Sequence, residues 1–126
     1  MGEYTNEKVL MRIYISENEI FAGKPLFETL TDLFKSEGFA GATVLKGLAG
    51  FGAQSGRRDD VPTKRARSLP LIVEVISCLE RIDEIIPKID RMMTGGMITL
   101  GKVAVARYCT NISRQEKLKE LKKMAN

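Results

Sequence analysis

The sequence predicts a single α+β domain whose elements follow the order β-α-β-β-α-β. Three observations indicate this order: an alternating strand pattern near the N-terminus, two amphipathic stretches at helical spacing, and apolar runs between and after them. A chain of 126 residues fits one domain. The order is that of the ferredoxin-like split βαβ arrangement, in which an antiparallel sheet carries two helices on one face.

The first half of the chain supplies a strand, a helix and a second strand. Apolar and polar residues alternate over 9–15, which is typical of a strand with one buried face. Pro25 suits the first position of a helix because its missing N–H costs nothing there, and Gly38 suits the C-terminal cap. Residues 42–46 predict the second strand. The helix has one apolar stripe, formed by Leu26, Phe27, Leu30, Leu33 and Phe34.

The second helix follows a strand that we expect to be buried on both faces. Residues 69–76 are almost continuously apolar, as in a buried strand. Ser77 and Glu80 have the spacing of a capping box and predict the start of the helix. Pro87 lies within the apolar stripe of this helix, and because the stripe keeps its register beyond the proline, we expect a kinked helix.

The last part of the chain predicts a fourth strand over residues 97–108, with Gly101 as a candidate bulge, and a basic helix over 113–126. Residues 1–7 are polar, and we expect them to be flexible. The sheet face away from the two main helices must then be covered by the terminal helix or by a second copy of the chain. The apolar residues expected on that face are Leu10, Tyr14, Ile72 and Ile76.

The composition argues against the commonest catalytic and metal sites. The chain has no histidine, which is the commonest general base and a frequent metal ligand. Its two cysteines, Cys78 and Cys109, are far apart in sequence and fit buried positions in a reducing cytoplasm. No apolar run in the sequence approaches the roughly 20 residues of a membrane span. We therefore expect a cytoplasmic protein that is not an enzyme, holds no metal and does not insert into a membrane.

A long segment between the second and third strands, residues 48–68, is the most informative part of the sequence. Four glycines in residues 47–56 allow successive N–H groups to turn toward one anion, although the same glycines would also suit a flexible loop. Gln54 adds a donor and an acceptor. The segment also holds part of the net charge of +4, carried by Arg57, Arg58, Lys64, Arg65 and Arg67.

Two motifs resemble those of the nitrogen-regulatory PII proteins. Residues 50–56, Gly-Phe-Gly-Ala-Gln-Ser-Gly, resemble the G-F-G-x-Q-x-G that opens the T-loop of that family. Residues 94–96 and the pair Gly101-Lys102 are similar to its nucleotide-binding B-loop, although the spacing is one residue longer and Leu100 replaces an aspartate. Residues 23–28 and 41–44 resemble an uncharacterised PII-like sub-family.

The resemblance implies a homotrimer with a cleft between subunits that binds an adenine nucleotide (AMP, ADP or ATP) as an effector rather than as a firmly held cofactor. It also implies that the T-loop-like segment contacts an unknown partner protein, membrane proteins included, through its five basic residues. The loop lacks tyrosine, so uridylylation is not expected there. The nucleotide-binding residues that the resemblance implies are Gly50, Gly52, Gln54, Gly95, Gly96, Lys102 and, more loosely, Arg107.

Three other functions fit the same fold less well. An RNA-recognition sheet needs aromatic residues on its central strands, and Tyr14 is the one aromatic residue on the predicted central strands. An acylphosphatase-type enzyme needs a phosphate-binding loop after the first strand, where this chain has the acidic segment 16–19. A CutA-like metal-tolerance trimer is weakened by the lack of histidine and of clustered cysteines.

Overall fold

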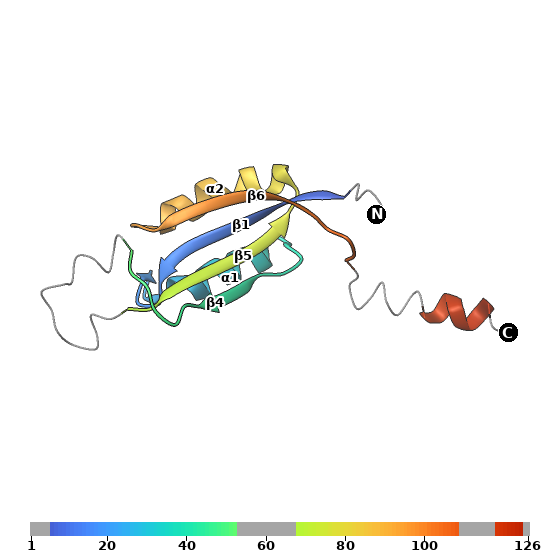
Figure 1. Ribbon diagram of the computed structural model, residues 1–126, viewed down its shortest axis with the longest axis horizontal. Helices are drawn as coiled ribbons and strands as arrows, with labels where there is room; N and C mark the ends of the chain where they lie inside the picture. The colour runs from blue at the N-terminus through green and yellow to red at the C-terminus, as the bar shows by residue number, and fades with distance from the viewer. Residues whose placement is uncertain (1–5, 53–67, 109–117, 125–126) are drawn as a thin grey trace, which may run out of the picture.

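The computed structural model describes residues 6–52, 68–108 and 118–124. In that part of the chain, four strands form one antiparallel sheet in the order β4-β5-β1-β6, and a two-stranded hairpin, β2-β3, precedes the first helix. The predicted α+β fold class is confirmed (Figure 1). The elements are β1 (Glu7–Ser16), β2 (Ile20–Phe21), β3 (Lys24–Pro25), α1 (Leu26–Ser36), β4 (Thr43–Lys46), β5 (Pro70–Ser77), α2 (Leu79–Met92) and β6 (Met97–Ala104).

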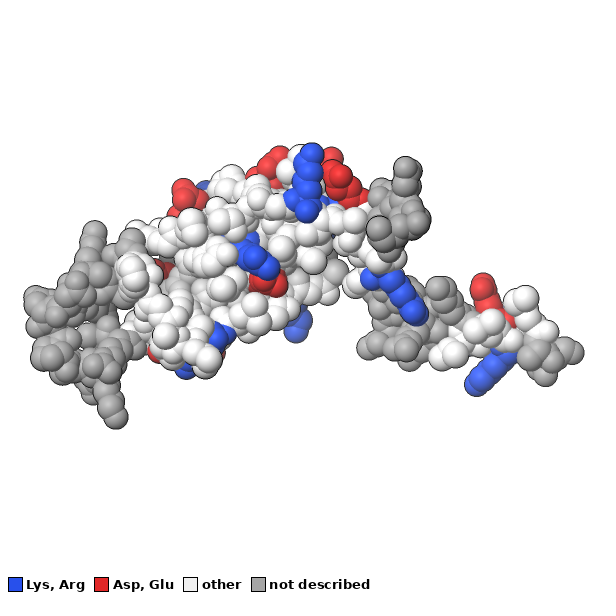
Figure 2. Space-filling view, viewed as in Figure 1, with Lys and Arg blue, Asp and Glu red and all other residues white. Residues whose placement is uncertain are grey.

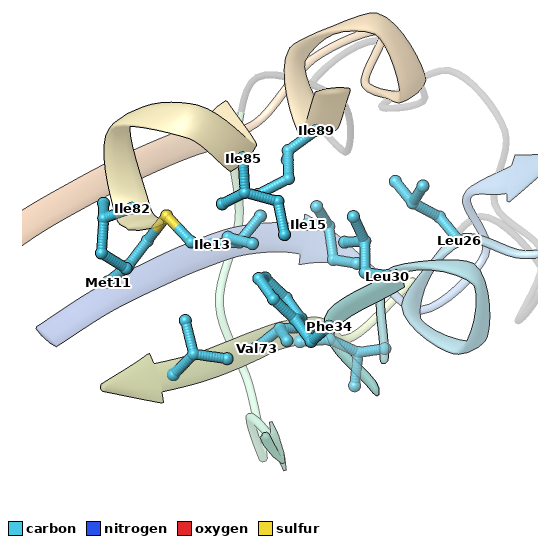
Figure 3. Close-up of a cluster of buried hydrophobic side chains, with 12 residues drawn as sticks. Met11, Ile13, Ile15, Leu26, Leu30, Phe34, Val73, Ile82, Ile85 and Ile89 are labelled. Carbon is cyan, nitrogen blue, oxygen red and sulfur yellow. The ribbon is translucent and has the colours of Figure 1, made fainter. Parts of the chain in front are cut away.

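The hydrophobic core lies between the sheet and the two helices (Figure 3). Alternate residues of β1 and β5 point toward the helices, as the strand period requires, and the apolar stripes of α1 and α2 face them. Every core position except the fully buried methionine of β1 is an aliphatic or phenylalanine side chain, and the core contains no buried polar group among the described residues. The core residues are Met11, Ile13, Ile15, Leu26, Leu30, Phe34, Leu71, Val73, Val75, Ile82, Ile85 and Ile89.

Helix α1 ends in the glycine cap that the sequence predicts. Gly38 has a φ of +78°, its N–H donates to the carbonyl of Lys35, and the N–H of Phe39 donates to that of Phe34. This is the Schellman pattern, and the rings of Phe34 and Phe39 supply its apolar contact with centroids 5.1 Å apart. At the other end the prediction is wrong by one residue, because Pro25 is the N-cap and the helix begins at Leu26.

Helix α2 runs without interruption from Leu79 to Met92 and includes Pro87, which agrees with the expectation that the helix continues past the proline. The predicted capping box is wrong. Cys78 is the N-cap, it makes no side-chain cap hydrogen bond, and Ser77 is the last residue of β5. Because Ser77 pairs with Val9 in the sheet, the strand extends through the position that the local pattern assigned to the helix.

Two further expectations about the C-terminal part are corrected. Strand β6 ends at Ala104, four residues before the predicted end at Tyr108, and its register with β1 is continuous through Gly101, so there is no bulge. Residues 118–124 are helical, as predicted, but Leu118 and Leu121 are exposed, so this helix is not what covers the free face of the sheet. None of the described helices is long and apolar enough to cross a membrane.

The open sheet face, opposite the helices, is largely apolar. The register pairs Tyr14 of β1 with Ile72 of β5 on one side and Met97 of β6 on the other, so these residues share that face. Figure 2 shows few charged groups there, apart from an adjoining basic and acidic pair near its middle. Arg12 and Glu74 form an ion pair of 2.6 Å on this face. The face consists mainly of Leu10, Tyr14, Leu45, Ile72, Ile76 and Met97.

Candidate functional site

A cleft of about 420 Å³ lies at the end of the sheet where β4 ends and β5 begins. Four parts of the chain meet there: the end of β1, the start of β6, the start of β5 and the residues that follow β4. In Figure 1 this is the end of the sheet at which the β5 arrow begins. The cleft is lined by Tyr14, Ile15, Ser16, Glu19, Gly50, Phe51, Gly52, Ser68, Pro70, Gly96 and Met97.

Close packing against Pro70 gives two of the predicted loop glycines a structural role. The N–H of Gly47 donates to the carbonyl of Pro70 at 2.8 Å, and a Cβ at Gly47 would lie 2.6 Å from the Pro70 ring. Gly50 has a φ of +150° and also approaches the Pro70 ring. At Gly52, by contrast, a Cβ would meet no atom within 4 Å, so local packing does not require a glycine there.

Glu17 joins both stems of the long segment to the end of β1. One carboxylate oxygen pairs with Nζ of Lys46 at 2.8 Å, and the other accepts the N–H of Leu69 at 3.2 Å. The backbone N–H of Glu17 also donates to the carbonyl of Leu69. The hydrogen bond from Lys46, followed by that from Leu69, holds the pKa of Glu17 below its ordinary value near 4.5. We call these contacts the Glu17 latch.

The Glu17→Gln substitution is expected to lower the free energy of unfolding at neutral pH, and its effect is expected to shrink in acid. Because the folded-state pKa of Glu17 lies below the unfolded value near 4.5, the ionised carboxylate stabilises the fold above that pH. This contribution is lost as the pH falls through the folded-state pKa. Urea unfolding of both proteins between pH ~7 and pH ~3 measures the difference.

The matched control is Glu84→Gln, which removes the same charge from an exposed position on α2. A difference between the native chain and Glu17→Gln that stays constant over this pH range would contradict the role assigned to the latch.

The structure brings together residues from both motifs that carry the PII resemblance, but not all of them. Gly50 and Gly52 from the first motif and Gly96 from the second line the same cleft, whereas Gly95 is not among its lining residues. Lys102 pairs with Val9 and lies five residues along β6 from Met97, which lines the cleft. At the usual rise of a strand, this separation is about 17 Å. The predicted site residues that lie outside the described part of the chain are Gln54, Arg57, Arg58, Lys64, Arg65 and Arg67.

Lys102 and Arg107 therefore belong to the opposite end of the domain. Nζ of Lys102 lies 3.8 Å from a carboxylate oxygen of Glu7, and its side chain is 82% exposed. Arg107 is exposed and follows the end of β6. Within one chain these two cations are not near Gly96, so the expectation that Lys102 and Gly96 act on the same phosphates requires a second copy of the chain.

Comparison with known proteins places the chain in a family. The model of the family DUF190, described as "Uncharacterized ACR", matches residues 8–105. The chain belongs to this family. A UPF0166 protein of Aquifex aeolicus (strain VF5) is 37% identical over 99 residues, which cover 79% of this chain and 93% of that protein. The UPF0166 protein MJ1524 of Methanocaldococcus jannaschii is 31% identical over 80 residues, covering 64% of this chain and 73% of that protein.

In this DUF190 protein the cleft also contains polar residues that the sequence analysis did not assign to a binding site. Ser16 and Ser68 both line the cleft, and their hydroxyl groups are in contact. Glu19 lines the cleft from the turn between β1 and β2, and its carboxylate oxygens are buried. The sequence signal that could have located these residues is their position directly before or after a predicted strand. Such residues lie at an end of the sheet, where they meet the loops of neighbouring strands.

Proposed function

We propose that this protein is a cytoplasmic PII-like regulatory protein that binds an adenine nucleotide and catalyses no reaction. One observation carries the proposal: Gly50 and Gly96, from two motifs far apart in the sequence, line the same cleft. Its volume of about 420 Å³ is within the range of small-molecule sites. The apolar wall formed in part by Tyr14, Pro70 and Met97 suits the flat face of a base.

The charge distribution supports a site completed by another subunit. Among the described lining residues there is no lysine or arginine, and Glu19 is acidic, so these side chains alone do not neutralise phosphate groups. In the proposed homotrimer, Lys102 and Arg107 of a neighbouring subunit approach the phosphates from outside. The open apolar sheet face is the surface that we assign to the contact between subunits.

The Glu17 latch supports a switching role for the segment between β4 and β5. Ser16 lines the cleft, and the next residue holds both stems of the segment. A ligand that shifts the end of β1 therefore also shifts the base of the segment. We propose that this movement changes how strongly the segment binds a partner protein, membrane proteins included.

The proposal predicts that Gly52→Leu weakens nucleotide binding without unfolding the protein. A side chain at Gly52 has room in the fold, and because Gly52 lines the cleft we expect a leucine there to compete with the ligand and to raise the Kd at least about 10-fold. The experiment is a thermal-shift panel with AMP, ADP and ATP, with and without magnesium. A ligand at ~100 times its Kd stabilises the native chain by about 2.7 kcal/mol, a shift of several degrees.

The matched control is Gly41→Leu, because a Cβ at Gly41 also meets no atom within 4 Å and Gly41 lies outside the cleft. Equal nucleotide shifts in the two variants would move the binding site elsewhere. If no nucleotide shifts the melting temperature of the native chain, the nucleotide proposal fails.

A further inference from the structure

Phe51 is an aromatic residue that lines the cleft and yet gains almost no cover from its own chain. It is 94% exposed, whereas Phe34 in the core is 1% exposed. Single exposed apolar side chains are common on protein surfaces, so exposure alone does not indicate a function. The position of Phe51 does, because this residue belongs to the wall of a cleft of small-molecule size. Its ring is therefore accessible to a ligand in that cleft.

The rest of the apolar wall belongs to the sheet. Tyr14, Pro70 and Met97 supply it from β1, β5 and β6, which are held together by strand pairing. Phe51 lies instead in the stem that follows β4 and belongs to no strand or helix. A flat group in the cleft therefore contacts a wall fixed by the sheet and a ring carried by a different part of the chain.

The base is the part of an adenine nucleotide that best matches the ring of Phe51. Phosphates are strongly hydrated anions, and ribose is a saturated ring with hydroxyl groups, so neither offers a flat apolar face. Every nucleobase has a π-face, and stacking on an aromatic side chain is a common way in which proteins hold bases. Among the described lining residues, the aromatic ones are Tyr14 and Phe51, and Phe51 is the more exposed of the two.

We infer that the ring of Phe51 stacks on the base of the bound nucleotide and that this contact holds the start of the long segment against the cleft. This inference rests on the proposed nucleotide function. It adds a direct physical link between the ligand and residues 48–68, because the ring belongs to that segment. Phe51 has a glycine on each side, Gly50 and Gly52, so the backbone can rotate to bring the ring onto the base.

The test places a tryptophan at position 51, because the chain has no tryptophan of its own. We expect ATP to lower the tryptophan emission of Phe51→Trp as the indole stacks on adenine, with a midpoint equal to the Kd from isothermal titration calorimetry. Tripolyphosphate, which has no base, should leave the emission unchanged. Leu48→Trp is the matched control, because Leu48 is 98% exposed in the same stem but does not line the cleft. Its emission should not respond to ATP.

A second pair of variants measures what the ring contributes to affinity. Stacking of one base on an aromatic side chain corresponds to about a 5-fold or larger change in affinity. We therefore expect Phe51→Ala to raise the Kd for ATP at least about 5-fold, and Leu48→Ala to leave it within about 2-fold of the native value. Melting temperatures measured without ligand establish that both variants are folded. This pair decides the question if Phe51→Trp itself binds no ATP.

Several results would overturn the inference and leave the nucleotide function standing. One is ATP binding by Phe51→Trp with no change in emission, and another is an equal decrease in both tryptophan variants. A native Kd in Phe51→Ala would have the same meaning. So would the emission of a buried indole in Phe51→Trp before ligand is added, which would indicate that a second copy of the chain covers the ring. If ATP does not bind the native chain, the proposed function itself fails, and the inference fails with it.

Discussion

The Gly96→Ala substitution is expected to lower the free energy of unfolding by at least about 2 kcal/mol. Gly96 has a φ of +94°, a conformation that residues with a Cβ rarely adopt. An added Cβ would also overlap the backbone carbonyl oxygen of Tyr14 and press on the end of the Met93 side chain. The carbonyl belongs to central strand β1, which is paired on both sides and cannot easily move away.

Gly41→Ala is the matched control, because a Cβ there meets no atom within 4 Å and its φ is not in the left-handed region. We expect Gly41→Ala to change stability by less than about 0.5 kcal/mol. Urea unfolding of the two variants and the native chain measures both effects. Similar stabilities of Gly96→Ala and Gly41→Ala would contradict the close approach of Gly96 to β1.

Features fixed by local chemistry were predictable from the sequence. The cap at Gly38 is an example, because a left-handed residue after a helix requires little more than a glycine in the right place. The alternating pattern over 9–15 was also sufficient to predict strand β1. Alternation over seven residues places the apolar side chains on one face of a strand, and no other regular structure fits it.

Features fixed by a partner strand were not predictable from local patterns. Strand β5 extends through Ser77 because Val9 is available to pair with it, and this displaces the expected capping box. Strand β6 ends at Ala104 because that residue pairs with Glu7, the first residue of β1. In both cases the extent of a strand depends on pairing with a neighbouring strand, which the segment's own composition does not encode.

The β2-β3 hairpin was missed for a different reason. Its two-residue turn, Ala22-Gly23, has positive φ at both positions, as in a type I′ turn. Asparagine or aspartate before the glycine is the usual signal for this turn, and alanine does not supply it. The hairpin matters for the site because it begins directly after Glu19.

The candidate site was predictable only where a motif marked it. The glycines were found because two motifs resemble those of a known family, and three of them share the cleft. Glu19 and Ser68 belong to no motif, and their proximity depends on how the chain folds. The position of Lys102 at the far end of β6 follows from the strand register, which the sequence motif does not reveal.

The open sheet face leads to the second large effect: Gly101→Arg is expected to convert a self-associated protein into a monomer. Gly101 pairs with Leu10, which alternates with the buried core residues of β1, so Gly101 lies on the open face. A Cβ there meets no atom within 4 Å in the chain itself, so an arginine should leave the monomer folded. Between two copies, however, its charge would be buried against apolar residues without a partner.

Sedimentation or light scattering measures the outcome directly. We expect the native chain to have about three times the 14.0 kDa mass of one chain and Gly101→Arg to have the mass of one chain, with unchanged helix and strand content by circular dichroism. Gly41→Arg is the control, because it adds the same charge at an open position away from the sheet and should keep the native mass.

A native chain that is itself monomeric would remove the trimer from the proposal, and with it the neighbouring subunit as the source of Lys102. A variant that keeps the native mass would show that the subunits meet through another surface, and the apolar open face would then need a different partner.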